Sequence, residues 1–153
     1  MENKVPSITD LHKQFAISCF NDTWKILEKE NASDDEICEG IRLAHASTWH
    51  WSKCGDELNQ QRGEWICSRV YAHFGFGDMA LYHAKRCYDL TLQHDFKDFD
   101  LGYGLEAMAR AYSVLKNKQE TKKFLDLAFS AAEKIEKEED KKWFLKDLNS
   151  ITI

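Results

Sequence analysis

The chain has 153 residues, about the size of one domain, and its 43% hydrophobic content is enough for a substantial buried core. A single proline, Pro6, and only seven glycines exclude β-sandwiches and barrels, which need many tight turns. With 21 basic and 26 acidic residues the net charge is −5. The basic stripe of a nucleic-acid-binding domain is missing, so no nucleic-acid partner is expected.

Membrane insertion and disulfide bonding are not expected either. No apolar run approaches the roughly 18 residues of a membrane-spanning helix, and the N-terminal residues lack the apolar region of a secretory signal. The five cysteines are odd in number and no two are separated by only two residues. They are typical of small buried residues in a reducing compartment. We therefore expect a cytoplasmic protein without a membrane partner.

Apolar residues recur at three- and four-residue spacing along the chain, which predicts an all-α fold. Capping residues, glycines and polar turns divide this pattern into seven helices. Their expected ranges are 8–29, 33–53, 57–74, 78–94, 101–116, 119–137 and 140–149, after a disordered or extended segment over residues 1–7. No low-complexity linker interrupts the pattern, so residues 1–153 are expected to form one domain.

Several side chains are expected at helix ends or on buried helix faces. Gly55 is placed where a helix ends in the left-handed conformation. The expected N-terminal caps are Ser7 or Thr9, Ser33 in a capping box with Glu36, Asp56, and Asp98 or Asp100. The expected apolar faces are Leu11, Phe15, Cys19, Trp24 and Leu27 on the first helix, and Trp143, Phe144 and Leu148 on the seventh.

A repeat of 41 residues relates the third and fourth helices to the fifth and sixth. The matched pairs are Gly63 with Gly104, Arg69 with Arg110, Tyr71 with Tyr112, Cys87 with Ala128, and Leu90 with Ala131. Two helix pairs of the same build therefore follow each other. We expect residues 57–94 and 98–137 to superpose with Tyr71 over Tyr112.

This pattern resembles the tetratricopeptide repeat family, in which a large residue, a small residue and a tyrosine recur in the first helix and alanine recurs in the second. The residues that carry the resemblance are Cys67, Ser68 and Tyr71 with Ala80, Ala84 and Cys87, and then Met108, Ala109 and Tyr112 with Thr121, Leu125 and Ala128. The repeat departs from the family in its length, and in having Glu64 and Leu105 at the tryptophan position and Leu92 and Glu133 at the proline position.

Segments 45–51 and 63–72 are also similar to small bacterial proteins of tetratricopeptide-like fold. The resemblance implies three antiparallel helix pairs in a right-handed array, closed by a C-terminal capping helix. It implies a fold and no particular activity.

In such an array the first helix of each pair lines a concave surface. Carried onto this sequence, the groove-lining residues are Arg62, Trp65, Arg69 and His73 from the third helix, with Tyr103, Glu106 and Arg110 from the fifth. Two arginines and two aromatic residues facing one hollow favour binding of a carboxylate beside an apolar side chain. The alternative is that Glu106 and Arg110 form an ion pair, while Trp65 and Tyr103 belong to the core.

A second candidate pocket lies around His45, Trp49 and His50 on the second helix. The pairs His50/Cys54 and His83/Cys87 have a spacing that four zinc ligands would need, but a packing role is favoured, so neither a metal nor a cofactor is expected. Glu64 and Glu106 are expected to pair with Arg62 and Arg110 rather than to act as catalytic carboxylates. No signature of a cysteine nucleophile is present, and no catalytic residue is assigned.

The sequence favours a non-enzymatic module that binds a peptide or protein segment, with an acidic or C-terminal carboxylate, in the concave groove. The first alternative is a small-molecule or enzymatic pocket around His45, His50, Trp65 and Arg69. The second is a regulatory domain without a DNA-binding helix-turn-helix. Whether the chain also forms a homodimer is left open.

Overall fold

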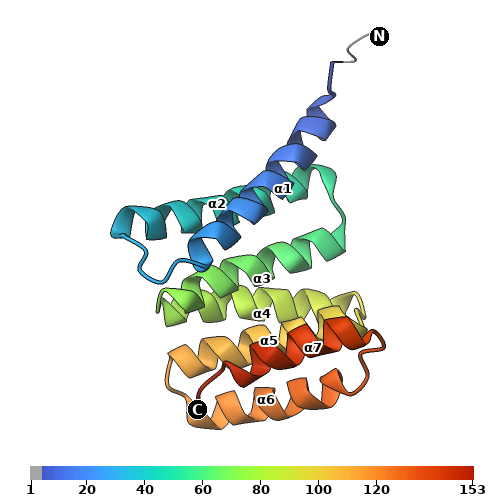
Figure 1. Cartoon of the computed structure of the whole chain (residues 1–153). Helices are drawn as coiled ribbons and strands as arrows, with labels where there is room; N and C mark the ends of the chain where they lie inside the picture. The colour runs from blue at the N-terminus through green and yellow to red at the C-terminus, as the bar shows by residue number, and fades with distance from the viewer. Residues whose placement is uncertain (1–4) are drawn as a thin grey trace.

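The computed structural model describes residues 5–153 and is helical without strands over that range (Figure 1). Its elements are α1 (Ile8–Leu27), α2 (Asp34–Cys54), α3 (Glu57–His73), α4 (Gly77–Gln93), α5 (Asp98–Val114), α6 (Lys118–Ala132) and α7 (Glu138–Asn149). Residues 1–4, part of the segment expected to be disordered or extended, lie outside the described residues, and Ser7 has extended backbone. No helix in residues 5–153 is both long and apolar enough to cross a membrane.

Consecutive helices pack side by side, and α1, α3, α5 and α7 also contact one another in that order. Within residues 5–153 there is no corresponding contact between α2 and α4 or between α4 and α6. The odd-numbered helices therefore form one continuous layer, and the even-numbered helices lie behind it. In Figure 1 the stack runs from α1 and α2 at one end to α6 at the other, with α7 lying across α5.

Three predicted helix starts are confirmed. Ser7, Ser33 and Asp56 are the N-caps of α1, α2 and α3, and each accepts a hydrogen bond from the backbone N–H three residues later. Each also belongs to a capping box, in which the side chain at that third position accepts from the cap's own N–H. Short polar side chains at these positions satisfy N–H groups that a helix leaves without an internal partner.

Other predicted helix ends are wrong. The N-cap of α5 is Lys97, without a side-chain hydrogen bond, and Asp100 instead accepts hydrogen bonds from Arg62. Gly55 is extended, with φ −103°, whereas Gly75 takes the left-handed conformation, with φ 84°. α6 ends at Ala132 rather than near residue 137, because Ile135 turns back into the core, where it is buried.

The buried faces of α1 and α7 differ from the predicted ones. Phe15 on α1 is 52% exposed, and the buried residues of that helix are Ala16, Thr23, Ile26 and Leu27. On α7, Phe144 and Leu148 are buried as expected, but Trp143 is 57% exposed. In each helix, one large side chain that was expected in the core lies at the surface instead.

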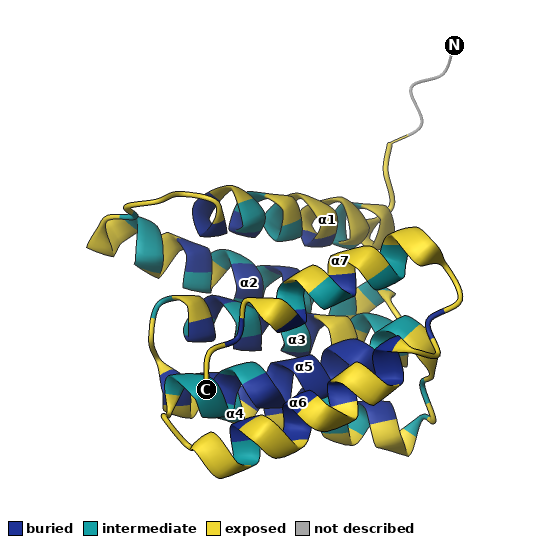
Figure 2. Cartoon of the chain, turned by 60° about the horizontal axis from the view of Figure 1, so that its bottom comes forward, coloured by how far each residue is buried: buried dark blue, intermediate teal, exposed yellow. Residues whose placement is uncertain are grey.

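The core divides into two clusters. The larger extends through α3 to α7 and is richest on α5, which runs buried through the middle of the molecule in Figure 2. The smaller consists of Leu27, Ala44, Ile66, Cys67 and Val70, contributed by α1, α2 and α3. Trp65 packs against both clusters. Of the five cysteines, which are all free, only Cys67 and Cys87 are buried.

The 41-residue offset is preserved in the structure. α3 and α5 begin at residues 57 and 98 and end at residues 73 and 114. Tyr71 stacks on the His83 ring at 5.6 Å, and Tyr112 stacks on Phe124, 41 residues after His83, at 5.8 Å. The two tyrosines thus occupy equivalent positions, each filling the space between the two helices of a pair.

Two glycines lie where one helix pair closely approaches the preceding one. A Cβ atom on Gly63 of α3 would lie 2.7 Å from the side chain of Thr48 on α2, and one on Gly104 of α5 would lie 2.9 Å from that of Thr91 on α4. The repeat therefore places a glycine where each pair packs on the preceding one.

Candidate functional site

A cavity of about 410 Å³ lies between the four odd-numbered helices. We call it the aromatic cavity. Its walls are Phe20 and Trp24 from α1, Gln61, Arg62 and Trp65 from α3, Phe99, Asp100 and Tyr103 from α5, and Trp143 and Asp147 from α7. Its volume falls in the usual range of ligand pockets.

Aromatic rings make up most of this wall. The Trp24 and Trp65 ring centres are 6.0 Å apart, those of Trp65 and Tyr103 5.2 Å, and those of Tyr103 and Phe99 4.6 Å. Phe20 continues the row at 6.5 Å from Trp24. The rings therefore form a continuous surface across three helices, held in tilted and edge-to-face packing.

One ion pair borders the cavity between α3 and α5. Arg62 donates from Nε and Nη2 to the two carboxylate oxygens of Asp100, at 2.8 and 3.2 Å. Beneath it, the buried Gln61 amide donates to Thr91 Oγ1 and to the Asp100 carbonyl, both at 3.0 Å. The fork geometry fixes the Asp100 side chain at the cavity wall.

Glu106 lies behind the aromatic wall and is fully buried. Its carboxylate accepts hydrogen bonds from the Trp65 indole N–H at 3.2 Å, from Arg69 Nη1 at 3.2 Å, and from Arg110 Nε. The alternative that Glu106 and Arg110 form an ion pair is confirmed, and Arg69 pairs with the same carboxylate. The arginine-rich hollow is therefore internally neutralised.

Asp147 on α7 completes this network. It accepts from the Tyr103 hydroxyl at 2.7 Å and from Arg69 Nη2 at 3.5 Å, and its backbone carbonyl accepts from Arg110 Nη2 at 3.0 Å. Burial and the hydrogen bond to Asp147 raise the pKa of Tyr103, so its hydroxyl stays protonated and acts as a donor. The last helix is thereby tied to both α3 and α5.

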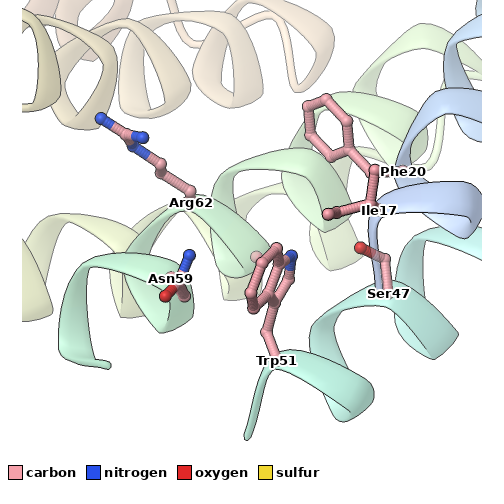
Figure 3. Close-up of a pocket in the computed structure, with 7 residues that line it drawn as sticks. Ile17, Phe20, Ser47, Trp51, Asn59 and Arg62 are labelled. Carbon is pink, nitrogen blue, oxygen red and sulfur yellow. The ribbon is translucent and has the colours of Figure 1, made fainter. Parts of the chain in front are cut away.

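Two further cavities adjoin this region. One, of about 180 Å³, shares Phe20 and Arg62 with the aromatic cavity and extends it toward Trp51 (Figure 3). The other, of about 250 Å³, lies at the C-terminal ends of α3 and α5 and is lined by Arg69, His73 and Arg110 together with residues 150–152. Burial lowers the pKa of His73, and the charges of Arg69 and Arg110 lower it further.

A separate polar cluster lies on the other face of α3. His83 Nδ1 is 2.7 Å from Glu64 Oε2, Arg86 donates to Glu64 Oε1 at 2.8 Å, and His45 Nε2 is 3.1 Å from the Tyr71 hydroxyl. Burial alone would raise the pKa of Glu64, but the hydrogen bonds from His83 and Arg86 outweigh it and lower that pKa. Glu64 thus pairs with residues of α4. The predicted pairing of Glu64 with Arg62 is wrong.

Cys67 is the nearest approach to a catalytic dyad in this cluster, since its Sγ is 3.9 Å from His45 Nδ1. However, Cys67 is fully buried, and burial raises its pKa to about 12. A thiol in that state is not the thiolate that nucleophilic catalysis needs. The arrangement is that of a packed core cysteine.

The residues of the second candidate pocket are distributed between two places. His50 Nδ1 lies 2.8 Å from His12 Nδ1, and Trp49, 54% exposed, packs edge-on against both rings. His45 instead faces Tyr71 and His83. The structure therefore does not bring His45 and His50 together with Trp65 and Arg69.

The two histidine–cysteine pairs do not converge. His50 faces α1 through His12, His83 faces Glu64, and Cys87 is enclosed in the core. Among residues 5–153, no three histidine, cysteine, aspartate or glutamate side chains are grouped in a way that could hold a metal ion.

Of the seven residues predicted for the groove, three line the aromatic cavity (Arg62, Trp65 and Tyr103), three line the cavity of about 250 Å³ (Arg69, His73 and Arg110), and Glu106 lines neither. Trp65, Arg69, Tyr103, Glu106 and Arg110 are linked in one hydrogen-bond network that includes Asp147. The sequence analysis missed Phe20, Trp24, Phe99, Asp100, Trp143 and Asp147 as part of this site. A signal existed for two of them, because Trp24, Trp65, Glu106 and Asp147 follow one another at intervals of 41 residues (65 − 24, 106 − 65, 147 − 106).

No protein-family model, curated protein or solved structure matches the chain.

Proposed function

We propose that this protein is a non-enzymatic binding module of tetratricopeptide-like build, with three helix pairs and a C-terminal capping helix, that takes a peptide or protein segment along its odd-numbered helices. The observation that carries the proposal is the aromatic cavity, to which all four of those helices contribute. A large side chain of the partner would occupy it, and aromatic walls of this kind supply much of the binding energy at interfaces.

Two observations support the tetratricopeptide-like part of the proposal. Contacts run along the odd-numbered helices and not along the even-numbered ones over residues 5–153, as expected where a stack of helix pairs curves. The equivalent stacking of Tyr71 on His83 and Tyr112 on Phe124 supports a true repeat.

The pairing of the polar groups supports binding rather than catalysis. Asp100 is held by Arg62, and Glu106 is shared by Arg69 and Arg110. Charges that already satisfy one another fix the shape of the cavity and leave its rings as the main contact surface.

A peptide selected from a random library against the purified chain tests this proposal. Its dissociation constant, measured by fluorescence anisotropy, should rise at least tenfold with Trp143→Ala. Tyr82→Ala is the matched control, because Tyr82 is 55% exposed on α4, outside the cavity, against 57% for Trp143. The proposal fails if the two substitutions change the affinity equally.

Recognition of a carboxylate remains a second candidate, favoured by the cavity in which Arg69, His73 and Arg110 meet. An acidic or C-terminal carboxylate of the partner would enter there rather than displace Glu106. Amidation of the selected peptide's C-terminus would then weaken its binding. Equal affinity of the amide and the free acid would exclude recognition of a terminal carboxylate at this cavity.

A further inference from the structure

We propose that the aromatic cavity recognises an organic ammonium group, such as the side chain of a lysine or methylated lysine in the bound segment. This inference rests on the proposed function and names the chemistry of the group that fills the cavity. Three features of the wall carry it: its ring faces, the cations already placed on them, and its charge.

The cavity is lined mainly by aromatic rings. Three tryptophans, two phenylalanines and a tyrosine surround one space of about 410 Å³. The face of an aromatic ring is the negative end of its quadrupole and attracts a cation within about 6 Å of the ring centre, most strongly for tryptophan. A cage of several such rings can hold an ammonium group and its alkyl substituents at the same time.

Two of these rings already attract cations of the chain. The Arg69 guanidinium carbon lies 5.9 Å from the centre of the Trp24 ring, and Lys146 Nζ lies 4.8 Å from the centre of the Trp143 ring. Neither Arg69 nor Lys146 lines the cavity, so these contacts show that the rings attract cations while leaving the cavity itself open to a ligand.

The charge of the wall favours a cation over an anion. Among the ionisable residues that line the cavity, Asp100 and Asp147 are acidic and Arg62 is the single basic one. Arg69 lies nearby, but it does not line the cavity, and it donates to the carboxylates of both Glu106 and Asp147. The whole chain carries a net charge of −5, which attracts cationic partners over a longer distance.

The competing occupant is an uncharged apolar side chain, and a pair of isosteres separates the two. Choline and 3,3-dimethylbutan-1-ol have nearly the same shape and differ in the quaternary nitrogen. Each is titrated into the ¹⁵N-labelled full chain while the indole N–H signals are followed by NMR. Choline should shift the signals of Trp24, Trp65 and Trp143 and leave that of Trp49 unchanged, because Trp49 lies outside the cavity.

We expect choline to bind at least tenfold more tightly than the alcohol, with Trp143→Leu reducing choline affinity and Tyr82→Ala leaving it unchanged. Affinity for choline should also fall as sodium chloride is raised, since a cation interacts with Asp100 and Asp147 through a screened field. Equal or tighter binding of the neutral alcohol, or shifts confined to Trp49, would overturn the inference.

A further arm separates the ammonium inference from the proposed function. A short peptide with one trimethyllysine is compared with the same peptide carrying acetyllysine and with free choline. Tighter binding of the trimethyllysine peptide than of choline supports both proposals. Binding of choline without any gain from the peptide retains the ammonium site and rejects the peptide groove. Equal binding of the two peptides, each tighter than that of choline, rejects the ammonium site.

Discussion

Glu106 satisfies three donors with a single buried carboxylate. Its partners Trp65 and Arg69 come from α3 and Arg110 from α5, so one side chain connects the two helices that carry most of the candidate site. A buried charge is tolerated only when it is paired and hydrogen-bonded in this way. Its role is therefore to hold the wall of the cavity in shape.

Arg69→Ala should accordingly lower stability. The substitution removes charged hydrogen bonds to Glu106 and Asp147. The Glu106 carboxylate remains buried, with Arg110 alone left to neutralise it. We expect the free energy of unfolding in urea to fall by about 1.5–3 kcal/mol.

Arg42→Ala is the matched control, since its side chain is 76% exposed in a 3.9 Å pair with Glu39, and it should change stability by about 0.5 kcal/mol or less. If Arg69→Ala left the unfolding midpoint unchanged while weakening peptide binding, Arg69 would be a binding residue rather than a structural one.

The histidines make stability depend on pH. Burial lowers the pKa of three histidines, His45, His50 and His73. A neighbouring charge lowers each pKa further: that of His83 acts on His45, and that of His12 acts on His50. The charges of Arg69 and Arg110 act on His73. The unfolded chain therefore takes up protons near pH 6.5 that the folded chain does not, and stability falls as pH drops through that value. The lowered pKa of Glu64 acts in the same direction at more acidic pH.

Urea unfolding should thus give a lower free energy at pH 5.5 than at pH 7.5. His45→Gln removes one of the contributing groups, so the difference between the two pH values should become smaller in that variant. A stability that rises on acidification would contradict this assignment of the histidines.

At this scale the sequence predicted that Trp65, Arg69 and Arg110 lie together, but it did not predict all of their partners. Helical spacing was enough to place Arg69 beside Trp65, and the repeat placed Arg110 beside Arg69. The partner Asp147 was missed because it lies on a helix outside the two aligned copies. The role of Glu64 was missed because an arginine two residues away along a helix, Arg62, points in a different direction.

On α7, two adjacent residues have different roles: one packs in the core and the other lines the aromatic cavity. Phe144 is fully buried against Gly102 and Tyr103 of α5, whereas Trp143 faces the aromatic cavity and is 57% exposed. Phe144 therefore packs into the core, and the residue before it, Trp143, contributes to the candidate site.

Substitutions at these two positions should have opposite consequences. Phe144→Ala should lower the free energy of unfolding by about 3–5 kcal/mol, since it leaves a cavity in the core. Trp143→Ala should change it by about 0.5 kcal/mol or less, while weakening ligand binding. Thermal unfolding of both variants provides the measurement, and comparable losses of stability in the two would show that Trp143 belongs to the core.

Helix existence and most boundaries could be predicted because local rules decide them. Ser33 with Glu36 and Asp56 are capping signals that act within one turn. The boundaries that failed depend on distant contacts. Asp100 is drawn to Arg62 on another helix, and α6 ends early because Ile135 enters the core. Phe15 packs against the His50 ring of α2 at 5.4 Å and still leaves 52% of its surface exposed.

For the molecule as a whole, burial is distributed unevenly along the stack. α5 has nine buried residues among its 17, and α1 has four among its 20. α1 and α2 belong to the smaller core cluster, while α5 is at the centre of the larger one. In a stack of repeats, each unit is stabilised mainly by its immediate neighbours.

Amide hydrogen exchange should therefore be fastest in α1 and α2 and slowest in α5, because local opening begins where the fewest apolar contacts must be broken. Mass spectrometry of peptides from each helix measures this order. Uniform protection along the chain would contradict it and would indicate that the two clusters open as one cooperative unit.

The 41-residue repeat could be predicted from Gly63, Arg69 and Tyr71, but its full extent could not. Tyr71 has no counterpart 41 residues earlier, where Glu30 stands, so the first helix pair did not align. Trp24 nevertheless lies 41 residues before Trp65, because it is on the side of α1 that faces the cavity, and that side is arranged as in the later repeats. The packing between α1 and α2 does not follow the repeat.

Trp65 packs against both core clusters and also lines the aromatic cavity. Ligand binding in the cavity should therefore affect the stability of the helices on both sides of it. A ligand that touches Trp24 of α1 and Trp143 of α7 together can bind only while α1 is in place. At a hundredfold excess over its dissociation constant, it would raise the free energy of opening α1 and α2 by about 2.7 kcal/mol. Slower amide exchange in α2, which contributes no side chain to the cavity, would then report that the cavity is occupied.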